Sequence, residues 1–386
     1  RIIRDREFDP AIRSHRQPFP MMFFAKPPQG WQPGFELSEG VFNGDKLDLA
    51  ASIFRKDNKP RSFSGPVVLT FEKDVSFEEN TFKDRVVWGY APESEAAEAL
   101  ESASETCIEK SIERRKKHTI RFSIPGLPWI EREWLWHSDN VRNLAFKDEY
   151  TETVMVKQAS AYFFVQGVEG TTRDHALYAV PLVYFDRALA RGMIEYTLKS
   201  IAEDGRFQYG MHGYGITAGF GLHDWPTDLP MAFLWAVTEY IFATRDFDIL
   251  DEGFEYYPRG CGKSRTLRDA IRQACDYLLD DIGTGQNGLM RVGTGDWNDP
   301  LQLHVRNRNV FKKKGESVYN SAMAVYVFPR IASLVDSWDE DYAQRLRQFG
   351  AAMLDAVRQQ WNGKWLYRAW DGEGRPLGRK SLYLEH

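Results

Sequence analysis

The sequence predicts a mainly helical chain in which a helical domain follows a β-rich amino-terminal segment. After Ile120, long stretches repeat apolar residues every three or four positions, as amphipathic helices do. Segment 1–91 instead has short β-branched and aromatic runs broken by prolines and glycines. We therefore expect a β-rich domain at 1–91, a helical linker at 92–118 and a helical domain at 119–386.

The first two segments are assigned from their local composition. The runs VVLTFEKDVSF and DRVVWGYAP carry residues that favour strands, and the prolines and glycines around them favour turns. From Pro92, the stretch PESEAAEALESASETCIEKSIERRKK opens with proline and is rich in Ala, Glu and Lys. This composition is typical of a solvated helix, which we expect to link the two domains.

The third segment has room for about eight helices. The clearest amphipathic stretches are 130–146, 173–201, 228–246, 266–283 and 317–338. Asp228 is placed to cap the third stretch, and Pro181 and Pro329 are expected to kink or break theirs. Because few strand patterns separate the helices, a bundle or toroid of helical hairpins is favoured over a βαβ sheet.

One long connection stands out in the helical domain. Stretch 283–315 is rich in glycine and polar residues and shows little helical pattern. A loop of about 30 residues without secondary structure is uncommon in a compact domain and is usually functional. In a helical toroid, such loops gather around one concave end, so we expect the binding site there.

Composition and charge exclude several classes of protein. The formal net charge is -5, from 50 basic and 55 acidic residues, which gives no field for nucleic acid or an anionic membrane. No apolar run approaches the roughly 20 residues of a membrane span, and the start RIIRDREFDP has no apolar signal core. The three cysteines are too few for a disulfide framework or a four-thiolate zinc site. We expect a cytoplasmic protein without a metal.

The aromatic content indicates carbohydrate. Aromatic residues make up 14% of the chain, and many stand beside glycine and polar residues, as in FQYGMHGYG and HDWPTDLP. Core packing alone would not place them there, although it explains most aromatics in any chain. Because aromatic rings stack on the apolar C–H faces of pyranose sugars, tryptophan near carboxylates favours sugar binding.

The octet GTGDWNDP, residues 293–300, brings two carboxylates, a tryptophan and an asparagine into one turn. Cleavage of a glycosidic bond needs a carboxylic acid to protonate the leaving oxygen. A tryptophan that shields a carboxyl from water raises its pKa, as that role requires. Asp299, with Trp297 two residues before it, has this setting. The alternative is a plain Asx turn ended by Pro300.

Four motifs in the same order resemble glycoside hydrolase family 94, the inverting cellobiose and chitobiose phosphorylases and their relatives. GTGDWND and KKKGESV are similar to that family's GDWNDGMN and KGESV. Upstream, GTTRDHALYAVP matches its Arg-Asp motif, and TDLPMAFLWAVTEYIFATRDFDILDE matches its helix running into ATGD..ILDE. The resemblance covers about residues 120–370. It implies an (α/α)6-barrel catalytic domain preceded by a β-sandwich and a helical linker.

The resemblance also implies roles for particular residues. Asp299 corresponds to the general acid, and Trp297 to the lining of the subsite for the sugar at the cleaved bond. Arg173 and Asp174 correspond to the pair that binds hydroxyls of that sugar, which suits a guanidinium fork and a carboxylate acceptor. A helix-start salt bridge is the alternative for this pair. An oligosaccharide, notably a β-linked glucoside, is implied as substrate, with inorganic phosphate as co-substrate and no other cofactor.

Further residues of the loops are candidates for the site. Sugar contacts are expected from Asp296, Asn298, Asp228 and His212. His304 lies in an arginine-flanked loop and has a weaker case. Glu316 has two interpretations: a capping acid at the start of a helix over 316–334, or a catalytic base for water.

The chain departs from the family in three places. PLQ follows Asp299 where the family has GMN, and HAL follows Asp174 where it has QLQ. The family's phosphate-binding His-Ser and Gly segment would lie beyond residue 386. Phosphorolysis is therefore favoured on the resemblance alone. An inverting hydrolase with Glu316 or another loop carboxylate as base stays open, as do a non-catalytic carbohydrate-binding protein and a homodimer.

Overall fold

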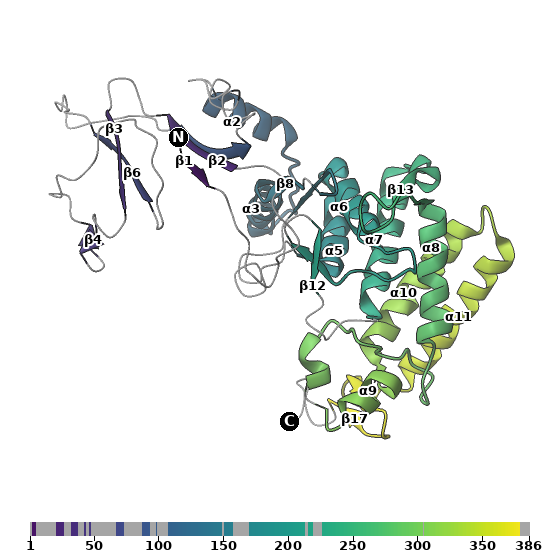
Figure 1. Cartoon of the computed structure of the whole chain (residues 1–386). Coiled ribbons are helices and arrows are strands. Elements are labelled where there is room, and N and C mark those ends of the chain that lie inside the picture. The colour runs from purple at the N-terminus through teal and green to yellow at the C-terminus, as the bar shows by residue number, and fades with distance from the viewer. Residues whose placement is uncertain are drawn as a thin grey trace. The chain divides into compact units, whose positions relative to one another are not determined.

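In a computed structural model, the chain forms two compact units, Arg1–His118 and Thr119–His386 (Figure 1). The structure describes residues 107–148, 150–156, 170–212, 215–218, 226–303 and 305–378, and before them Glu98 and the strands named below.

Unit 1 contains antiparallel strand pairs. The strands are β1 (Ile2–Arg4), β2 (Met21–Lys26), β3 (Gln32–Leu37), β4 (Phe42–Asn43), β5 (Lys46–Leu47), β6 (Val67–Glu72) and β7 (Val87–Pro92). β2 lies between β1 and β7, while β3 pairs with β6 and β4 with β5. The two runs with strand composition form β6 and β7. The β-sandwich itself stays a prediction.

The helix α2 (Cys107–His118) lies in the predicted linker. Its first turn carries Glu109 and its last turn carries four basic residues, an order that complements the helix dipole. None of its side chains is buried, in agreement with a solvated helix. Apart from Pro92, which ends β7, and Glu98, the linker before Cys107 lies outside the described residues.

Unit 2 is built mainly from helices, which confirms the helical class. They are α3 (Pro128–Asn143), α5 (Thr172–Leu182), α6 (Arg187–Lys199), α7 (Asp228–Thr244), α8 (Leu267–Asp276), α9 (Arg308–Lys314), α10 (Val318–Val335) and α11 (Glu340–Arg358). Shorter turns are η3 (Asp248–Asp251), η4 (Tyr277–Ile282) and η5 (Asp299–Leu303), of which η4 is a π-helical continuation of α8.

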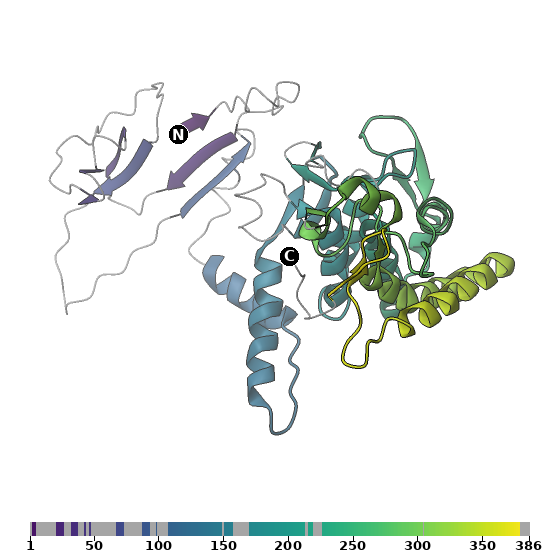
Figure 2. The ribbon, with the colours of Figure 1, turned by 90° about the horizontal axis from the view of Figure 1, so that it is seen from below.

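The helices share one core. α5 packs against α6 and α7, α7 packs against α10, and α10 forms a hairpin with α11 (Figures 1 and 2). α7 is buried around most of its circumference, with Phe233 and Ile241 fully inside, so it is the central helix. Although α7 is strongly apolar, no helix in the described ranges is long and apolar enough to cross a membrane.

Polar side chains decide where most of these helices begin. Thr171, Asp186 and Ser317 each accept a hydrogen bond from a main-chain N–H in the first turn of α5, α6 and α10. Asp186 thereby divides the predicted stretch 173–201 into two helices. The predicted cap at Asp228 is wrong, because Thr227 precedes α7 and makes no capping hydrogen bond.

The two helical prolines behave differently. α5 ends at Leu182, one residue after Pro181, as expected for a residue that cannot donate a helical hydrogen bond. α10 instead runs through Pro329 to Val335, so a break there is not observed. Gly350 of α11 faces this proline, and its missing side chain lets the two helices approach.

Short antiparallel strands occur between the helices, contrary to expectation. They are β8 (Ala145–Asp148), β9 (Thr153–Val156), β10 (Gly170–Thr171), β11 (Gly210–His212), β12 (Ile216–Ala218), β13 (Gly253–Glu255), β14 (Ser264–Thr266), β15 (Glu316–Ser317), β16 (Ala369–Trp370) and β17 (Pro376–Leu377). Each has four residues or fewer, too short for a period-two pattern. The sheets β10–β11–β12 and β15–β16–β17 hold the starts of α5 and α10.

The connection 283–315 is more regular than expected. It contains η5 and the seven-residue helix α9, whose first turn is capped by Asn307. A helix this short has too few turns for a periodic signal, which explains why the sequence pattern missed it.

We expect Gly192→Ala to destabilise the protein, although alanine normally favours a helix over glycine. Gly192 lies on α6 with its Cα against β9, where a Cβ would sit 1.9 Å from the carbonyl oxygen of Val154. Overpacking of this kind costs roughly 1–3 kcal/mol. Urea denaturation measures the free energy of unfolding of this variant and of the control Gly350→Ala. At Gly350 a Cβ would lie 3.2 Å from a side-chain atom of Pro329, so the control should lose less stability. A Gly192→Ala protein as stable as the parent would contradict this packing.

Candidate active site

Arg173 is buried near the start of α5 and binds carboxylates from two other elements. Its Nη1 donates to Oδ2 of Asp228 at 2.7 Å and to Oδ1 of Asp299 at 2.9 Å. Its Nη2 donates to the other oxygen of Asp299 at 3.2 Å. Nη1 also reaches the main-chain carbonyl of Asp296 at 3.3 Å. One guanidinium therefore joins α5, the first residue of α7 and the octet.

Asp174 belongs to the cap of α5. Its main-chain N–H donates to Oγ1 of Thr171, whose hydroxyl donates to the Asp174 carboxylate at 2.7 Å. An Asp174 oxygen lies 3.6 Å from Nε of Arg173, so the helix-start ion pair is present. That ion pair is one part of a larger network, because the guanidinium's other nitrogens bind carboxylates of α7 and the octet.

Burial and charge act against each other in this network. Burial raises the pKa of the Asp228 carboxyl, and Arg173 opposes that shift. Burial lowers the pKa of Arg173, but Asp228, Asp299 and Asp174 outweigh it and the net shift is upward. Arg173 is thus held as a cation, and its removal would leave the buried Asp228 without its partner.

The octet's outer edge is open to solvent. The Trp297 ring is 51% exposed and lies 5.4 Å from the guanidinium carbon of Arg173. The Asp299 side chain is 27% exposed. Tyr209, which the sequence did not single out beyond its place in FQYGMHGYG, donates to Oδ2 of Asp299 at 3.3 Å. A ligand arriving here would meet an indole ring and a carboxyl whose orientation is held by two donors.

Asp296 has different surroundings from Asp299. It is buried, and Arg368 binds both of its oxygens, one through Nη1 at 3.1 Å and the other through Nη2. Ser317 donates to it as well, and the main-chain N–H of Asn298 donates at 2.9 Å. The geometry favours a role as loop anchor over the predicted sugar contact. No sequence pattern pointed to Arg368.

Glycine is required at position 295 for the octet to reach this place. A Cβ on Gly295 would sit 2.2 Å from Oδ1 of Asp228 and 2.4 Å from Cβ of Pro226. Its carbonyl accepts from Nδ2 of Asn320 at 3.1 Å. The octet therefore lies directly on the starts of α7 and α10.

Glu316 lies outside the Arg173 network. It accepts from main-chain N–H groups of Asn287 at 2.9 Å and Leu289 at 3.2 Å, and from Nδ2 of Asn287 at 2.6 Å. The capping interpretation is wrong, because α10 begins at Val318 with Ser317 as its cap. Side chains alternate along β15, so Ser317 reaches Asp296 while Glu316 holds the neighbouring turn. A role as base stays a prediction.

Asn298, His212 and His304 are the other loop residues that the sequence proposed for the site. Asn298 opens the turn into η5, with its carbonyl accepting from the N–H of Leu301 at 2.9 Å. His212 has its main chain in β11, and its side chain lies outside the described residues, as do His304 and the ring of Pro300. Within the described ranges, no group of three His, Cys, Asp or Glu side chains is arranged to hold a metal ion.

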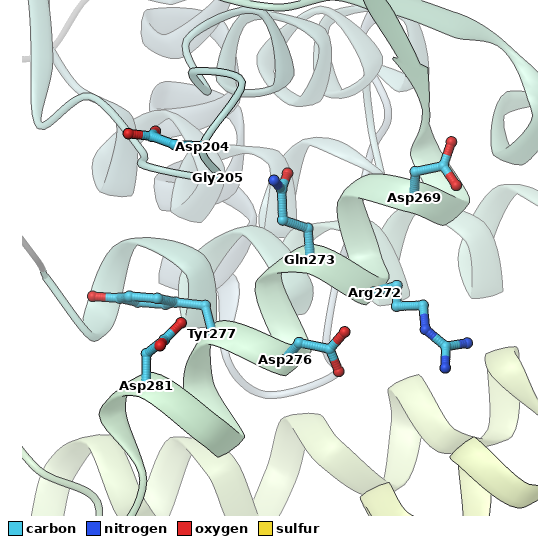
Figure 3. Close-up of a pocket in the computed structure, with 8 residues that line it drawn as sticks. All are labelled: Asp204, Gly205, Asp269, Arg272, Gln273, Asp276, Tyr277 and Asp281. Atoms are coloured by element: carbon cyan, nitrogen blue, oxygen red, sulfur yellow. The ribbon is translucent and has the colours of Figure 1, made fainter.

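A cavity of about 620 Å³ beside α8 and η4 contains none of the predicted residues. This acidic cavity is lined by Asp204, Gly205, Asp269, Arg272, Gln273, Asp276, Tyr277 and Asp281 (Figure 3). Four aspartates face one arginine there, a balance that disfavours phosphate. Its size alone does not make it the active site, because it lacks the octet's carboxyl and indole.

His175 follows the Arg-Asp pair and is fully buried. Its Nδ1 lies 2.8 Å from the carbonyl oxygen of Thr171, and its ring centroid lies 4.5 Å from that of Tyr196. Burial lowers the pKa of His175 from 6.5 to about 4. The imidazole is therefore neutral at pH 7 and packs as part of the core under the site.

Comparison with known proteins places these observations in a family. The profile of the glycosyl hydrolase 94 superfamily, catalytic domain, matches residues 147–383. The 3-O-beta-D-glucopyranosyl-beta-D-glucuronide phosphorylase of Paenibacillus borealis is 29% identical over 154 residues, which are 39% of this chain and 19% of that protein. The match therefore spans about a fifth of that relative's length. The crystal structure of a sugar epimerase from a ruminal bacterium is 14% identical in sequence, and the match covers 63% of this chain and 58% of the epimerase chain. Its TM-score of 0.44 supports no inference.

We expect Arg368→Met to destabilise the protein by about 3 kcal/mol, because it leaves the buried Asp296 carboxylate without its ion-pair partner. Adding Asp296→Asn should recover part of that loss, since the uncompensated charge is then gone. Urea denaturation of the single and double variants measures both effects. Arg375→Met, at an exposed arginine of the same region, is the control. Equal losses at positions 368 and 375 would refute the anchor.

We expect His175 to make the protein less stable in acid. The unfolded histidine takes up a proton near pH 6.5 and the folded one only near pH 4, so between these values the unfolded state binds more protons. Stability should fall by up to about 3 kcal/mol from this residue as the pH drops through that window. Urea titrations from pH 7 to 4 should show a weaker pH dependence for His175→Gln, and the parental dependence for the exposed control His137→Gln. An unchanged slope in His175→Gln would refute the assignment.

Proposed function

We propose that this chain, which belongs to the glycosyl hydrolase 94 superfamily, cleaves a glycosidic bond of an oligosaccharide by inverting phosphorolysis, with Asp299 as general acid. The observation that carries the proposal is the Arg173 network. It holds one carboxyl of the octet at the solvent-exposed edge beside Trp297 and uses the other carboxyl as an anchor. Among the described residues of this network Asp299 is the most exposed carboxyl, which suits a reaction in which one acid protonates the leaving group and phosphate supplies the nucleophile.

In the proposed reaction, Asp299 transfers a proton to the glycosidic oxygen as the bond to the anomeric carbon breaks. A phosphate oxygen attacks that carbon from the opposite face, so the configuration inverts. The electron pair of the broken bond stays on the leaving oxygen, which takes the proton. The products are a sugar 1-phosphate and the shortened saccharide, and Asp299 is left as a carboxylate.

Arg173, Tyr209 and Trp297 have supporting roles in this proposal. The two hydrogen bonds from Arg173 and the one from Tyr209 orient the Asp299 carboxyl before substrate arrives. The exposed indole of Trp297 offers an apolar face for the ring of the sugar at the cleaved bond. Asp228 acts through Arg173, whose charge it balances.

The relative from Paenibacillus borealis suggests the substrate class. Its name describes a phosphorylase of a β-linked glucosyl glucuronide, so a β-linked glucoside is the first candidate here. The proposal includes an (α/α)6 barrel, to which unit 2 contributes the consecutive pairs α5–α6, α7–α8 and α10–α11. A β-sandwich at 1–91 and the linker 92–118 would precede the barrel.

Hydrolysis is the second candidate, with Glu316 as the base that activates water. The hydrogen bonds of Glu316 argue against it, because both carboxylate oxygens already bind the turn at Asn287. Incubation with a panel of β-linked gluco-oligosaccharides, with and without inorganic phosphate, separates the two reactions. A sugar 1-phosphate that requires phosphate means phosphorolysis. Free reducing sugar at the same rate without phosphate means hydrolysis, and binding without product means a carbohydrate-binding protein.

We expect Asp299→Asn to lower kcat by at least about a hundredfold, because general-acid catalysis contributes roughly 10²–10⁴ in rate. Binding of the saccharide should change little, since the amide keeps the side chain's shape. Product release on the active substrate, together with calorimetric titration, measures both quantities. Asp281→Asn, in the acidic cavity, is the matched control and should keep the parental kcat. Parental turnover in Asp299→Asn would remove this residue from the acid role.

A further inference from the structure

A second cavity lies beside the short sheet that anchors the octet. β15 contributes Ser317 to the contact with Asp296, whereas its neighbour Glu316 lines a cavity of about 530 Å³. Its lining residues come from the end of α9, the turn joining β16 and β17, and the turn 284–287. This volume is within the range of about 300–1,000 Å³ that is usual for small-molecule sites.

The walls of this cavity are held in place by close main-chain packing. A Cβ on Gly285 would sit 2.5 Å from the carboxyl carbon of Glu316, so only glycine lets that turn approach the carboxylate that binds it. Gly372 has a φ of +81°, and a Cβ there would lie 3.0 Å from the main chain at Lys314 and Gly315. The cavity therefore exists before any ligand arrives.

The charge on its lining is mainly positive. Arg291, Lys313 and Lys314 line the cavity, and across the described part of the chain neither lysine forms an ion pair. Among the described residues that line the cavity the acid is Glu316, which already accepts hydrogen bonds from the turn at Asn287. All three lysines of the last turn of α9 complement the helix dipole, but Lys312 does not line the cavity and Lys313 and Lys314 do.

An indole ring forms part of the same wall. Trp370 lines the cavity, and its Nε1 donates to Oε1 of Gln360 at 2.8 Å, which fixes the orientation of the ring. Thr284, Gln286 and Asn287 also line the cavity. An aromatic face with amide and hydroxyl groups suits a sugar ring, whose faces are apolar and whose edge carries hydroxyls.

We propose that this cationic cavity, formed by Arg291, Lys313, Lys314, Trp370 and the turn 284–287, binds a sugar that carries an anion. The shared chemistry is one negatively charged group on a saccharide, present as the carboxylate of a uronic acid or as a phosphate ester. The anion lies against the lysines and the sugar ring lies on Trp370. This site is separate from the Arg173 network and does not depend on the proposed cleavage reaction.

Calorimetric titration with D-glucuronate, D-glucose 6-phosphate, D-glucose and inorganic phosphate tests the proposal. At least one anionic sugar should bind more tightly than both glucose and phosphate, and more weakly as salt is added. Lys313→Gln combined with Lys314→Gln should lower that affinity by about tenfold, as expected for the loss of charge-assisted hydrogen bonds. Lys312→Gln is the matched control and should stay within about twofold of the parent.

The different ligands and variants in this experiment identify the anionic group and distinguish binding in the cavity from binding at the cleavage site. If only glucuronate binds tightly, the recognised anion is a carboxylate. If only glucose 6-phosphate binds tightly, it is a phosphate ester. Asp299→Asn should retain this binding even where turnover is lost, so failure of the cleavage reaction leaves the cavity's test intact. The proposal is overturned if glucose or phosphate binds as tightly as the anionic sugars, if neither anionic sugar binds, or if Lys312→Gln weakens binding as much as the double variant.

Discussion

The burial of one arginine determines how the candidate-site end of unit 2 is assembled. A guanidinium cannot shed its charge at ordinary pH, so burying one is costly unless other groups compensate its charge, and carboxylates do so most directly. Asp228 and Asp299 meet this requirement from two different elements. The starts of α5, α7 and η5 are consequently brought together, and the position of Asp299 is a result of the charge balance of Arg173. The same hydrogen bonds therefore stabilise this end of unit 2 and, in the proposed reaction, orient Asp299.

A second arginine, Arg368, gives the two aspartates of the octet different surroundings. Arg368 and Ser317 take both oxygens of Asp296, which ties the turn to the sheet under α10. Asp299, three residues later, keeps an edge toward solvent. Two aspartates in one motif thus have different roles, one holding the loop and one available to a ligand. The cationic cavity lies beside this anchor, because residues of the paired strands β15 and β16 line it. The residues that line the cavity differ from those that bind Asp296.

Charge is distributed unevenly over the cavities of unit 2. The acidic cavity beside α8 collects four aspartates, whereas the cavity beside α9 collects three cations. In a chain whose net charge is -5, a cationic hollow is a local exception that attracts anions. A negatively charged saccharide would therefore be guided toward the sheet that supports the octet and away from α8.

The sequence by itself determined the helical class and the positions of the long helices, and it selected the octet as the predicted place of the chemistry. Runs of apolar residues at helical spacing are enough to locate α3, α7 and α10, because this signal is carried by neighbouring turns of the chain. The helix α9 and the short strands have too few residues for such a signal. Only the tertiary structure decided that Asp228 balances Arg173, that Glu316 holds a turn, and that Tyr209 and Arg368 support the two aspartates. These contacts join residues 55 to 90 positions apart in the chain, except for Glu316 at 27 to 29, and local patterns carry no information about partners that only folding brings together.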